Sequence, residues 1–342
     1  MARINRIGII GLVHDHIWNY LAAAKDVPDL EIACGADPNP PLLQKIQKQL
    51  GWKDSALYAD PAGMLDREKL DACLIFTESS RHADLTELCA RRGLHVMVEK
   101  PMALNVAHAQ RMIRAAKENN IRLMVNFPTQ WNAELMGVFE AIQAGKIGRV
   151  WMTHFREGHK GPREIGCSEY FWKWLYDPEK NGGGALVDFC VYGASMTALL
   201  LGRPNRVSAA SGKLVKTDLA AEDNGVITAQ YDDKRAIAVI EGTWTQVAQG
   251  NNMSVFGELG SIASTPFLPK EYYINTTAGG LRKIPPAQLL AHEDKPIKYF
   301  VHRVRNDIPF HGLVNPENAL MAQEMLEAGL KSIELRREVA LG

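Results

Sequence analysis

Residues 7–13 read IGIIGLV, an apolar run that breaks at Gly11 and therefore predicts a buried strand leading into a tight turn. Further apolar runs follow at 30–36, 72–77, 95–99 and 122–127, and segments with helical spacing separate them. This alternation of strands and helices predicts a parallel, doubly wound sheet of the Rossmann type. Such an α/β sheet binds ligands at the carboxyl ends of its strands, so we expect a nucleotide crevice there.

The second half of the chain has a different pattern. Strand-like segments are joined by short turns, which favour antiparallel pairing, and they lie at 151–156, 205–211, 224–231, 236–245 and 251–256. Helices are expected at 132–144, 185–201 and 316–336. The sequence thus predicts a dinucleotide-binding Rossmann domain over residues 1–126 and a substrate and oligomerisation domain over 127–342. The second domain would be α+β with a large, open-faced, mainly antiparallel sheet, and its C-terminal helix, 316–336, would pack back near the first domain.

Length and composition are those of an ordinary globular protein. The 342 residues are 46% hydrophobic, and 39 Lys plus Arg balance 39 Asp plus Glu. Without a net charge to attract nucleic acid or an anionic membrane, we expect neither as a partner and a small molecule instead. The five cysteines are scattered and form no Cys-x-x-Cys pair, which favours a reduced cytoplasm. No run reaches the roughly 20 apolar residues of a membrane span.

The first turn matches the dinucleotide fingerprint in part. Gly11 supplies the tight turn, whereas Val13 and His16 stand where the pattern has its other glycines. Asp37 ends the second strand 21 residues beyond His16, a place from which a carboxylate reaches a ribose diol. This position favours NAD as the cofactor, with NADP possible, because a 2'-phosphate beside Asp37 would be repelled. The alternative for Asp37 is a turn residue before Pro38.

His14 and His16 form a His-x-His pair directly after the first strand. Such a pair can begin the metal site of a barrel hydrolase, but that fold needs further histidines at later strand ends and strand-helix alternation to about residue 300. The second half of the sequence provides neither. We therefore expect no metal and place both histidines at a helix start near phosphate, with His14 as a cofactor contact.

Two charged residues stand in apolar surroundings. Lys100 follows the apolar run 94–98, and Asp188 is the one charge in segment 185–201, which has the composition of a buried helix. An isolated buried carboxylate is costly, so Asp188 needs a partner or a cavity. Tyr192 lies four residues further on the same helix face. A core Tyr that satisfies a buried Asp is the alternative, but together with Lys100 the pair favours a catalytic site.

Three aromatic residues of the second half are candidate substrate contacts. Flat rings such as those of Trp131 and Trp172 suit the C–H faces of a sugar or cyclic polyol, although aromatic residues are more often part of a core. His159 lies in a polar segment that is either a substrate contact or a solvated turn.

Several motifs together resemble the Gfo/Idh/MocA family (glucose-fructose oxidoreductase, inositol dehydrogenase and rhizopine catabolism). They are IGIIG at 7–11, Thr77 with His82, GLHVMVEKP at 93–101 and GGGALVD at 182–188. The resemblance covers nearly the whole chain. It implies NAD(P)-linked oxidation of a hydroxyl or reduction of a carbonyl, and homo-oligomers (dimers or tetramers) through the open sheet face.

The resemblance also assigns roles by position. Asp188 and Tyr192 fall on the family's acid/base pair, beside Lys100, and Tyr at this position is typical of the branch that resembles glucose-fructose oxidoreductase. With the residues of the first turn, the expected cofactor contacts are Gly11, Val13, His14, Asp37, Thr77, His82, Glu99 and Lys100.

We therefore predict an NAD(P)-dependent dehydrogenase or reductase that acts on the CH-OH group of a sugar, cyclic polyol or related small molecule. In this hypothesis Tyr192 takes the proton of the substrate hydroxyl, and the ammonium of Lys100 lowers the pKa of the phenol from its usual value of about 10. Two alternatives stay open: a glycosidase-type enzyme that uses NAD transiently, and a non-catalytic sensor that binds dinucleotide or sugar.

Overall fold

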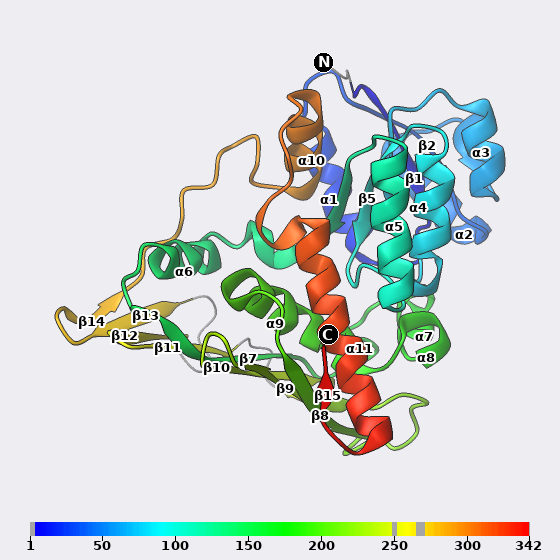
Figure 1. The fold of residues 1–342 in the computed structure, drawn as a ribbon. Helices are drawn as coiled ribbons and strands as arrows, with labels where there is room; N and C mark the ends of the chain where they lie inside the picture. Colours follow the sequence, from blue (N-terminus) through cyan, green and yellow to red (C-terminus); the bar gives the residue numbers. More distant parts are fainter. Residues whose placement is uncertain (1–3, 248–251, 265–270, 342) are drawn as a thin grey trace.

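The structure, a computed structural model, describes residues 4–247, 252–264 and 271–341 (Figure 1). The first half forms the parallel sheet that the sequence predicts, with six strands in the order β3-β2-β1-β4-β5-β6. These strands are β1 (Arg6–Ile10), β2 (Glu31–Ala36), β3 (Leu57–Tyr58), β4 (Ala72–Ile75), β5 (His95–Glu99) and β6 (Leu123–Asn126). The strand order reverses between β1 and β4, which opens a crevice at their carboxyl ends.

Five α-helices connect these strands, and each buries one apolar face. They are α1 (His16–Ala24), α2 (Pro40–Leu50), α3 (Pro61–Arg67), α4 (His82–Ala90) and α5 (Val106–Glu118), with single 3₁₀ turns at Asp54–Ala56 and Ser79–Arg81. The side chain of Asn105 caps α5 by accepting a hydrogen bond from the N–H of His108, at 2.8 Å.

The second half forms a nine-stranded sheet in the order β14-β13-β12-β11-β7-β10-β9-β8-β15. Its strands are β7 (Val150–Gly158), β8 (Arg206–Gly212), β9 (Asn224–Tyr231), β10 (Ala236–Thr243), β11 (Asn252–Gly257), β12 (Gly260–Ser264), β13 (Tyr272–Thr276), β14 (Gly280–Lys283) and β15 (Val339–Ala340). Among the described strands β7 and β10 pair in parallel and the other neighbours are antiparallel, which confirms the mainly antiparallel prediction. Residue 251, the expected start of one strand, lies outside the described residues.

The helices of this half lie on one side of the sheet, toward the first half, and in the described part of the chain no helix covers the opposite face (Figure 1). They are α6 (Ala133–Gln143), α7 (Glu169–Leu175), α8 (Pro178–Asn181), α9 (Ala185–Leu201), α10 (Pro296–Arg305) and α11 (Pro316–Leu335), with 3₁₀ turns at Pro128–Trp131 and Gly312–Val314. The span Pro178–Leu201 is long and apolar enough to cross a membrane, but 89% of its most apolar window is buried inside the fold. Burial of this kind is what a core helix of a globular protein shows.

The start of α9 is fixed by glycines and one carboxylate. A Cβ added to Gly184 would lie 2.0 Å from the backbone oxygen of Glu222, so a larger residue would push the two segments apart. The side chain of Glu222 accepts hydrogen bonds from the N–H groups of Gly184 at 2.7 Å and Leu186 at 3.1 Å. These bonds satisfy the free amides of the first turn and hold the helix in place.

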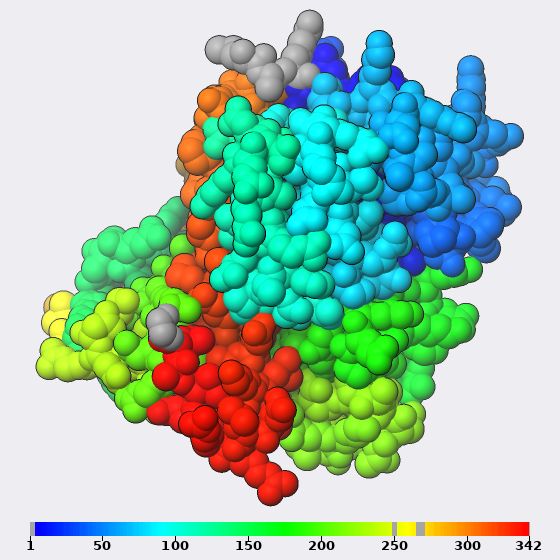
Figure 2. All heavy atoms as spheres, turned by 45° about the vertical axis from the view of Figure 1, so that its right-hand side comes forward, coloured from blue at the N-terminus to red at the C-terminus, as the bar shows by residue number. Residues whose placement is uncertain are grey.

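The C-terminal segment returns to the first half of the chain. Arg305 of α10 donates two hydrogen bonds to the carbonyl of Ile4, at 2.7 and 2.9 Å. Glu327 of α11 accepts one from the N–H of Val106 at the start of α5, at 2.6 Å. Figure 2 shows the red C-terminal helix directly below the teal surface of α5. The two sheets are therefore joined by segments far apart in the sequence.

Candidate active site

The two halves of the chain meet at a buried ion pair. Nζ of Lys100, directly after β5, lies 2.7 Å from Oδ1 of Asp188 in the first turn of α9. The same ammonium donates to the backbone carbonyl of Asp188, at 3.2 Å. The two side chains are only 5% and 6% exposed, so neither water nor salt screens the pair strongly. Two of the three residues that the sequence predicts to be catalytic are thus in direct contact, and the third, Tyr192, lies beside them.

Asp188 has a second partner that sequence reasoning missed. Nε1 of Trp244, a fully buried residue just after β10, donates to Oδ2 of Asp188 at 2.9 Å. Burial by itself raises the pKa of Asp188, but attraction to Lys100 and the hydrogen bonds from Lys100 and Trp244 outweigh it, and the pKa lies below its usual value. The carboxylate is therefore ionised at neutral pH. No local sequence pattern around Trp244 indicates this contact.

Tyr192 contacts the ion pair through the face of its ring. The ammonium nitrogen of Lys100 lies 4.6 Å from the ring centroid, which is a cation–π contact. Burial raises the pKa of Tyr192 well above its usual value, and the nearby charges of Glu157, Asp188 and Glu99 raise it further. The pKa therefore lies above its usual value, opposite to the direction expected from Lys100 alone, because burial is the largest cause of the shift. Tyr192 is a neutral phenol and can give a proton.

The first turn lies at the crevice, as predicted. Gly11 has φ of +81°, and a Cβ there would lie 2.3 Å from the side chain of Thr77, so this position requires glycine. Asp37 follows β2 and is 1% exposed; its carboxylate accepts hydrogen bonds from the N–H groups of Leu12 at 2.6 Å and Asn39 at 2.7 Å. Asp37 thus stabilises the first turn. The sequence did not indicate this role beside the expected contact with the ribose.

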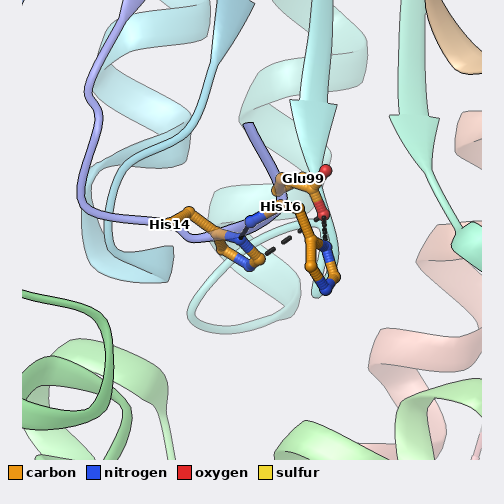
Figure 3. Close-up of side chains that lie close together, drawn as sticks. All are labelled: His14, His16 and Glu99. Carbon is orange, nitrogen blue, oxygen red and sulfur yellow. Dashed lines mark hydrogen bonds and ion pairs between the residues drawn. The ribbon is translucent and has the colours of Figure 1, made fainter. Parts of the chain in front are cut away.

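His14, His16 and Glu99 converge at the ends of β1 and β5 (Figure 3). Oε2 of Glu99 lies 3.0 Å from Nδ1 of His16 and 3.9 Å from Nε2 of His14. Oε1 of the same, fully buried carboxylate accepts a hydrogen bond from the amide of Asn126 at 2.5 Å. Burial lowers the pKa of His14, and the positive charges of His16 and Lys100 lower it further, so His14 is neutral.

The remaining predicted cofactor contacts, His82, Thr77 and Val13, are buried and make contacts within the protein. His82 is fully buried; its Nδ1 lies 3.1 Å from the carbonyl oxygen of Pro101, and its Nε2 lies 3.3 Å from that of Thr77. Thr77 is 1% exposed, and the carbonyl of Val13 accepts a long hydrogen bond from Nε1 of Trp174, at 3.5 Å. In this structure His82 braces the loop that follows Lys100.

The three candidate substrate contacts lie in different surroundings. Trp131 donates a hydrogen bond to Asn126 at 3.2 Å, next to the carboxylate of Glu99. The ring of His159 packs edge-on against Phe189, the neighbour of Asp188, with centroids 4.7 Å apart. Trp172 of α7 packs beside Tyr176, the residue that follows this helix, with ring centroids 6.0 Å apart. Within the described residues Trp172 has no ring contact with the ion pair.

Asp15, between the two histidines, ties the first turn to α7. Its carboxylate accepts hydrogen bonds from the N–H and the hydroxyl of Ser168, at 2.6 and 2.7 Å. Ser168 in turn caps α7, whose Phe171 and Trp174 pack on the ring of His14, with centroids 4.7 and 5.7 Å apart. Sequence reasoning missed this link, because Asp15 and Ser168 are 153 residues apart.

Two protein-family models match the chain, in the order in which its two sheets occur. The model described as "Oxidoreductase family, NAD-binding Rossmann fold" covers residues 5–127, and the "GFO/IDH/MocA C-terminal domain" covers residues 137–263. The chain belongs to the Gfo/Idh/MocA oxidoreductase family. The resemblance drawn from the motifs is confirmed. The barrel hydrolase is excluded because the parallel sheet ends at β6 and the later described strands form a separate, mainly antiparallel sheet.

Individual Gfo/Idh/MocA relatives are distant in sequence. Myo-inositol 2-dehydrogenase of Thermotoga maritima is 24% identical over 98% of this chain and 98% of that protein. The scyllo-inositol 2-dehydrogenase (NAD(+)) of Bacillus subtilis is 22% identical over 88% of this chain and 86% of its own length. Among solved structures, an Agrobacterium radiobacter oxidoreductase in complex with NAD+, L-tartaric acid and magnesium has a TM-score of 0.84, at 19% identity over 99% of this chain and 98% of that one. Levoglucosan dehydrogenase in complex with NADH and levoglucosan has a TM-score of 0.81, at 18% identity over 98% of each chain. These structural similarities show the fold.

In this Gfo/Idh/MocA chain the two most specific motifs are in direct contact. Lys100 belongs to the motif at 93–101 and Asp188 to the motif at 182–188, and their side chains form the ion pair described above. The NAD-binding domain thus contributes a lysine that contacts α9, which packs on the nine-stranded sheet.

Proposed function

We propose that the chain is an NAD(P)-dependent dehydrogenase or reductase that transfers a hydride between the nicotinamide and a CH-OH or carbonyl carbon of a sugar or cyclic polyol. The observation that carries the proposal is the contact of Lys100 with Asp188 and Tyr192 at the mouth of the nucleotide crevice. Residues 1–126 would bind the dinucleotide, and residues 127–342 would bind the substrate.

The residues of the crevice fit a dinucleotide. The turn at Gly11 leads into the N-terminus of α1, where free backbone amides attract phosphate. Asp37, at the end of β2, would contact the adenine-side ribose and favours NAD. Val13, His14 and Thr77 would line the track, and Glu99 and Lys100 would lie at its nicotinamide end. When bound, the nicotinamide accepts or supplies the hydride.

Two side chains would handle the proton. In the reduction direction Tyr192, a neutral phenol, would give its proton to the carbonyl oxygen as that oxygen gains negative charge, and would become a phenolate. In the oxidation direction the phenolate form would take the proton of the substrate hydroxyl. Lys100 would polarise the same oxygen, because its ammonium is held in place by Asp188. Trp244 would fix the carboxylate from the other side. The Tyr at this position supports placement in the branch that resembles glucose-fructose oxidoreductase.

The substrate class rests on the family and on the aromatic residues near the site. Relatives are named for myo-inositol, scyllo-inositol, D-apiose and D-glucosides. Trp131 beside Glu99 and His159 beside Asp188 are the side chains that we assign to substrate contact, with Trp172 further out. Rings of this kind suit the C–H faces of such molecules.

The test is a titration followed by a substrate panel. Binding of NAD(H) and NADP(H) would be measured by fluorescence, and the preferred cofactor would be used with inositols, apiose, levoglucosan and glucosides. We expect reduction of the cofactor with at least one of them. Indifference to all four nucleotides would refute the proposal. Sugar release without NADH accumulation would favour the glycosidase-type enzyme, and binding without turnover would favour the sensor.

We further propose that the chain is cytoplasmic and forms homo-oligomers through the uncovered face of the nine-stranded sheet. Ile237 on β10 is 46% exposed, and Val226 and Val239 lie on the same face by strand register. Exposed apolar side chains on an uncovered sheet face favour association. Light scattering should show a dimer or tetramer, and Ile237→Glu should shift it toward monomer.

A further inference from the structure

His14, His16 and Glu99 present three metal-binding atoms to one point. One ring nitrogen of His14, one ring nitrogen of His16 and a carboxylate oxygen of Glu99 all lie within 4.8 Å of one another. Glu99 is fully buried and His14 is 1% exposed, whereas the side chain of His16 is 28% exposed and leaves an entry path. Figure 3 shows the three side chains turned toward one another from two different strand ends.

The distances suit a transition-metal ion. Bonds of about 2.0–2.2 Å to zinc place neighbouring donor atoms roughly 3.3 Å apart in a tetrahedron. The observed separations from Oε2 of Glu99, 3.0 and 3.9 Å, lie on either side of that value. Two imidazoles and one carboxylate are also the ligand set of open zinc sites, in which a water or another ligand completes the shell.

We propose that His14, His16 and Glu99 form a binding site for a divalent transition-metal ion of the zinc class. The surrounding residues support the ligands. Asn126 holds Oε1 of Glu99, which leaves Oε2 directed at the histidines, and Trp131 holds Asn126 in turn. Outer contacts of this kind orient the ligands of metal sites.

Two contacts have to change when an ion binds, and they limit the affinity. The hydrogen bond between Nδ1 of His16 and Glu99 is replaced by two metal bonds. The proton of His14 moves to Nδ1, which lies 3.4 Å from the backbone nitrogen of His16, so this long contact has to open. We therefore expect a dissociation constant on the order of micromolar, weaker than that of structural zinc sites.

A second His-Glu-His cluster serves as an internal comparison. His292, Glu293 and His302 also lie within the same distance limit, but at the surface. Arg303 binds both oxygens of Glu293, at 2.6 and 3.1 Å, so that carboxylate is already paired with a cation. Glu99 has no arginine or lysine among its ion-pair partners in the described residues. A divalent ion is therefore favoured at Glu99.

The ion would lie in the crevice that the proposed function gives to the dinucleotide. Its ligands follow β1 and end β5, on either side of β4, so an ion bound there would occupy the path toward Lys100. We expect zinc and NADH to exclude each other. This consequence rests on the proposed function, whereas binding of the ion does not.

Calorimetric titration of metal-free protein with Zn²⁺ tests the site. In a His302→Ala background, which removes the surface cluster, we expect one ion per chain. Adding His16→Ala or Glu99→Gln should weaken binding at least ~10-fold. The control is His154→Ala. His154 pairs with Glu241 at 2.7 Å on the nine-stranded sheet, so this substitution should leave zinc binding unchanged.

Two further measurements keep the result interpretable. Urea unfolding of each variant checks that it is folded, and the visible spectrum of Co²⁺ reports imidazole ligation directly. The proposal is overturned if the His302→Ala protein binds no zinc, or if His16→Ala and Glu99→Gln bind it as tightly as their parent.

Competition is measured by NADH fluorescence with and without Zn²⁺. We expect the apparent dissociation constant for NADH to rise in proportion to the zinc concentration. Unchanged NADH affinity at saturating zinc would overturn the exclusion. If NADH does not bind at all, the proposed function fails, and the calorimetric titration still decides the metal site.

Discussion

Replacement of Lys100 by Met should destabilise the fold as well as slow the reaction. Lys100 and Asp188 are 5% and 6% exposed and 2.7 Å apart, so Lys100→Met leaves a carboxylate buried without its cation. Breaking such a pair costs about 3–5 kcal/mol of unfolding free energy. Because Trp244 keeps its hydrogen bond to Asp188, we expect the lower end, about 3 kcal/mol.

The double variant Lys100→Met/Asp188→Asn is the matched control. It removes the charge that the single variant leaves behind, and Trp244 can still donate to the amide oxygen. Replacing both members of a buried pair is often neutral, so we expect the double variant to recover all but about 1 kcal/mol. Turnover should stay at least ~100-fold below wild type in both, since neither has the ammonium.

The assay is urea unfolding at several pH values. In the wild type the pKa of Asp188 is below its usual value, so its contribution is present above the unfolded pKa near 4 and is lost as the pH falls through the folded pKa. In Lys100→Met the buried carboxylate favours its protonated form, which is most stable at low pH. The stability gap between the two proteins should therefore narrow on acidification. The reasoning would be refuted if Lys100→Met had the same urea midpoint as the wild type at pH 7. It would also be refuted if the double variant were as unstable as the single one.

Three other substitutions give graded outcomes. Trp244→Phe removes a charge-assisted hydrogen bond and should lower the unfolding free energy by about 1.5–3 kcal/mol. Trp174→Phe is the control and should cost less, because the indole N–H of Trp174 makes only a long contact of 3.5 Å. The urea midpoints of the two variants compare these losses. Gly184→Ala places a Cβ 2.0 Å from a backbone oxygen and should lower the unfolding free energy by at least about 3 kcal/mol. Its control is Gly63→Ala in a helix, where the nearest neighbour of the added Cβ lies at 3.5 Å; this change should alter stability by less than about 1 kcal/mol. Thermal unfolding compares the two variants. Gly11→Ala strains a φ of +81° at the first turn, and its NADH affinity, measured by fluorescence, should fall at least ~10-fold; an unchanged affinity would separate this turn from cofactor binding.

Local sequence predicted individual elements well where a single face or a whole element is buried. The strand predicted at 95–99 and the helix predicted at 185–201 have these same bounds in the structure. In both, the apolar run of the sequence is bounded by a charge or a glycine, and a local stretch of sequence is enough to recognise that pattern.

Other elements were missed because their sequences carry a weaker signal. Strand β14 is exposed throughout, and β15 has only two residues. The parallel pairing of β7 with β10 was also beyond a local reading, since alternation of side chains is the same in parallel and antiparallel strands.

The candidate site shows the same division. The sequence by itself determined that a buried lysine and a buried carboxylate exist, because charges inside apolar runs are costly unless paired. Only the tertiary structure decided that Trp244 is the second partner of Asp188, that Tyr192 stays protonated, and that two histidines meet Glu99. Each of these depends on distances between segments far apart in the chain, and hydrogen bonds and pKa values respond to such distances rather than to sequence neighbours.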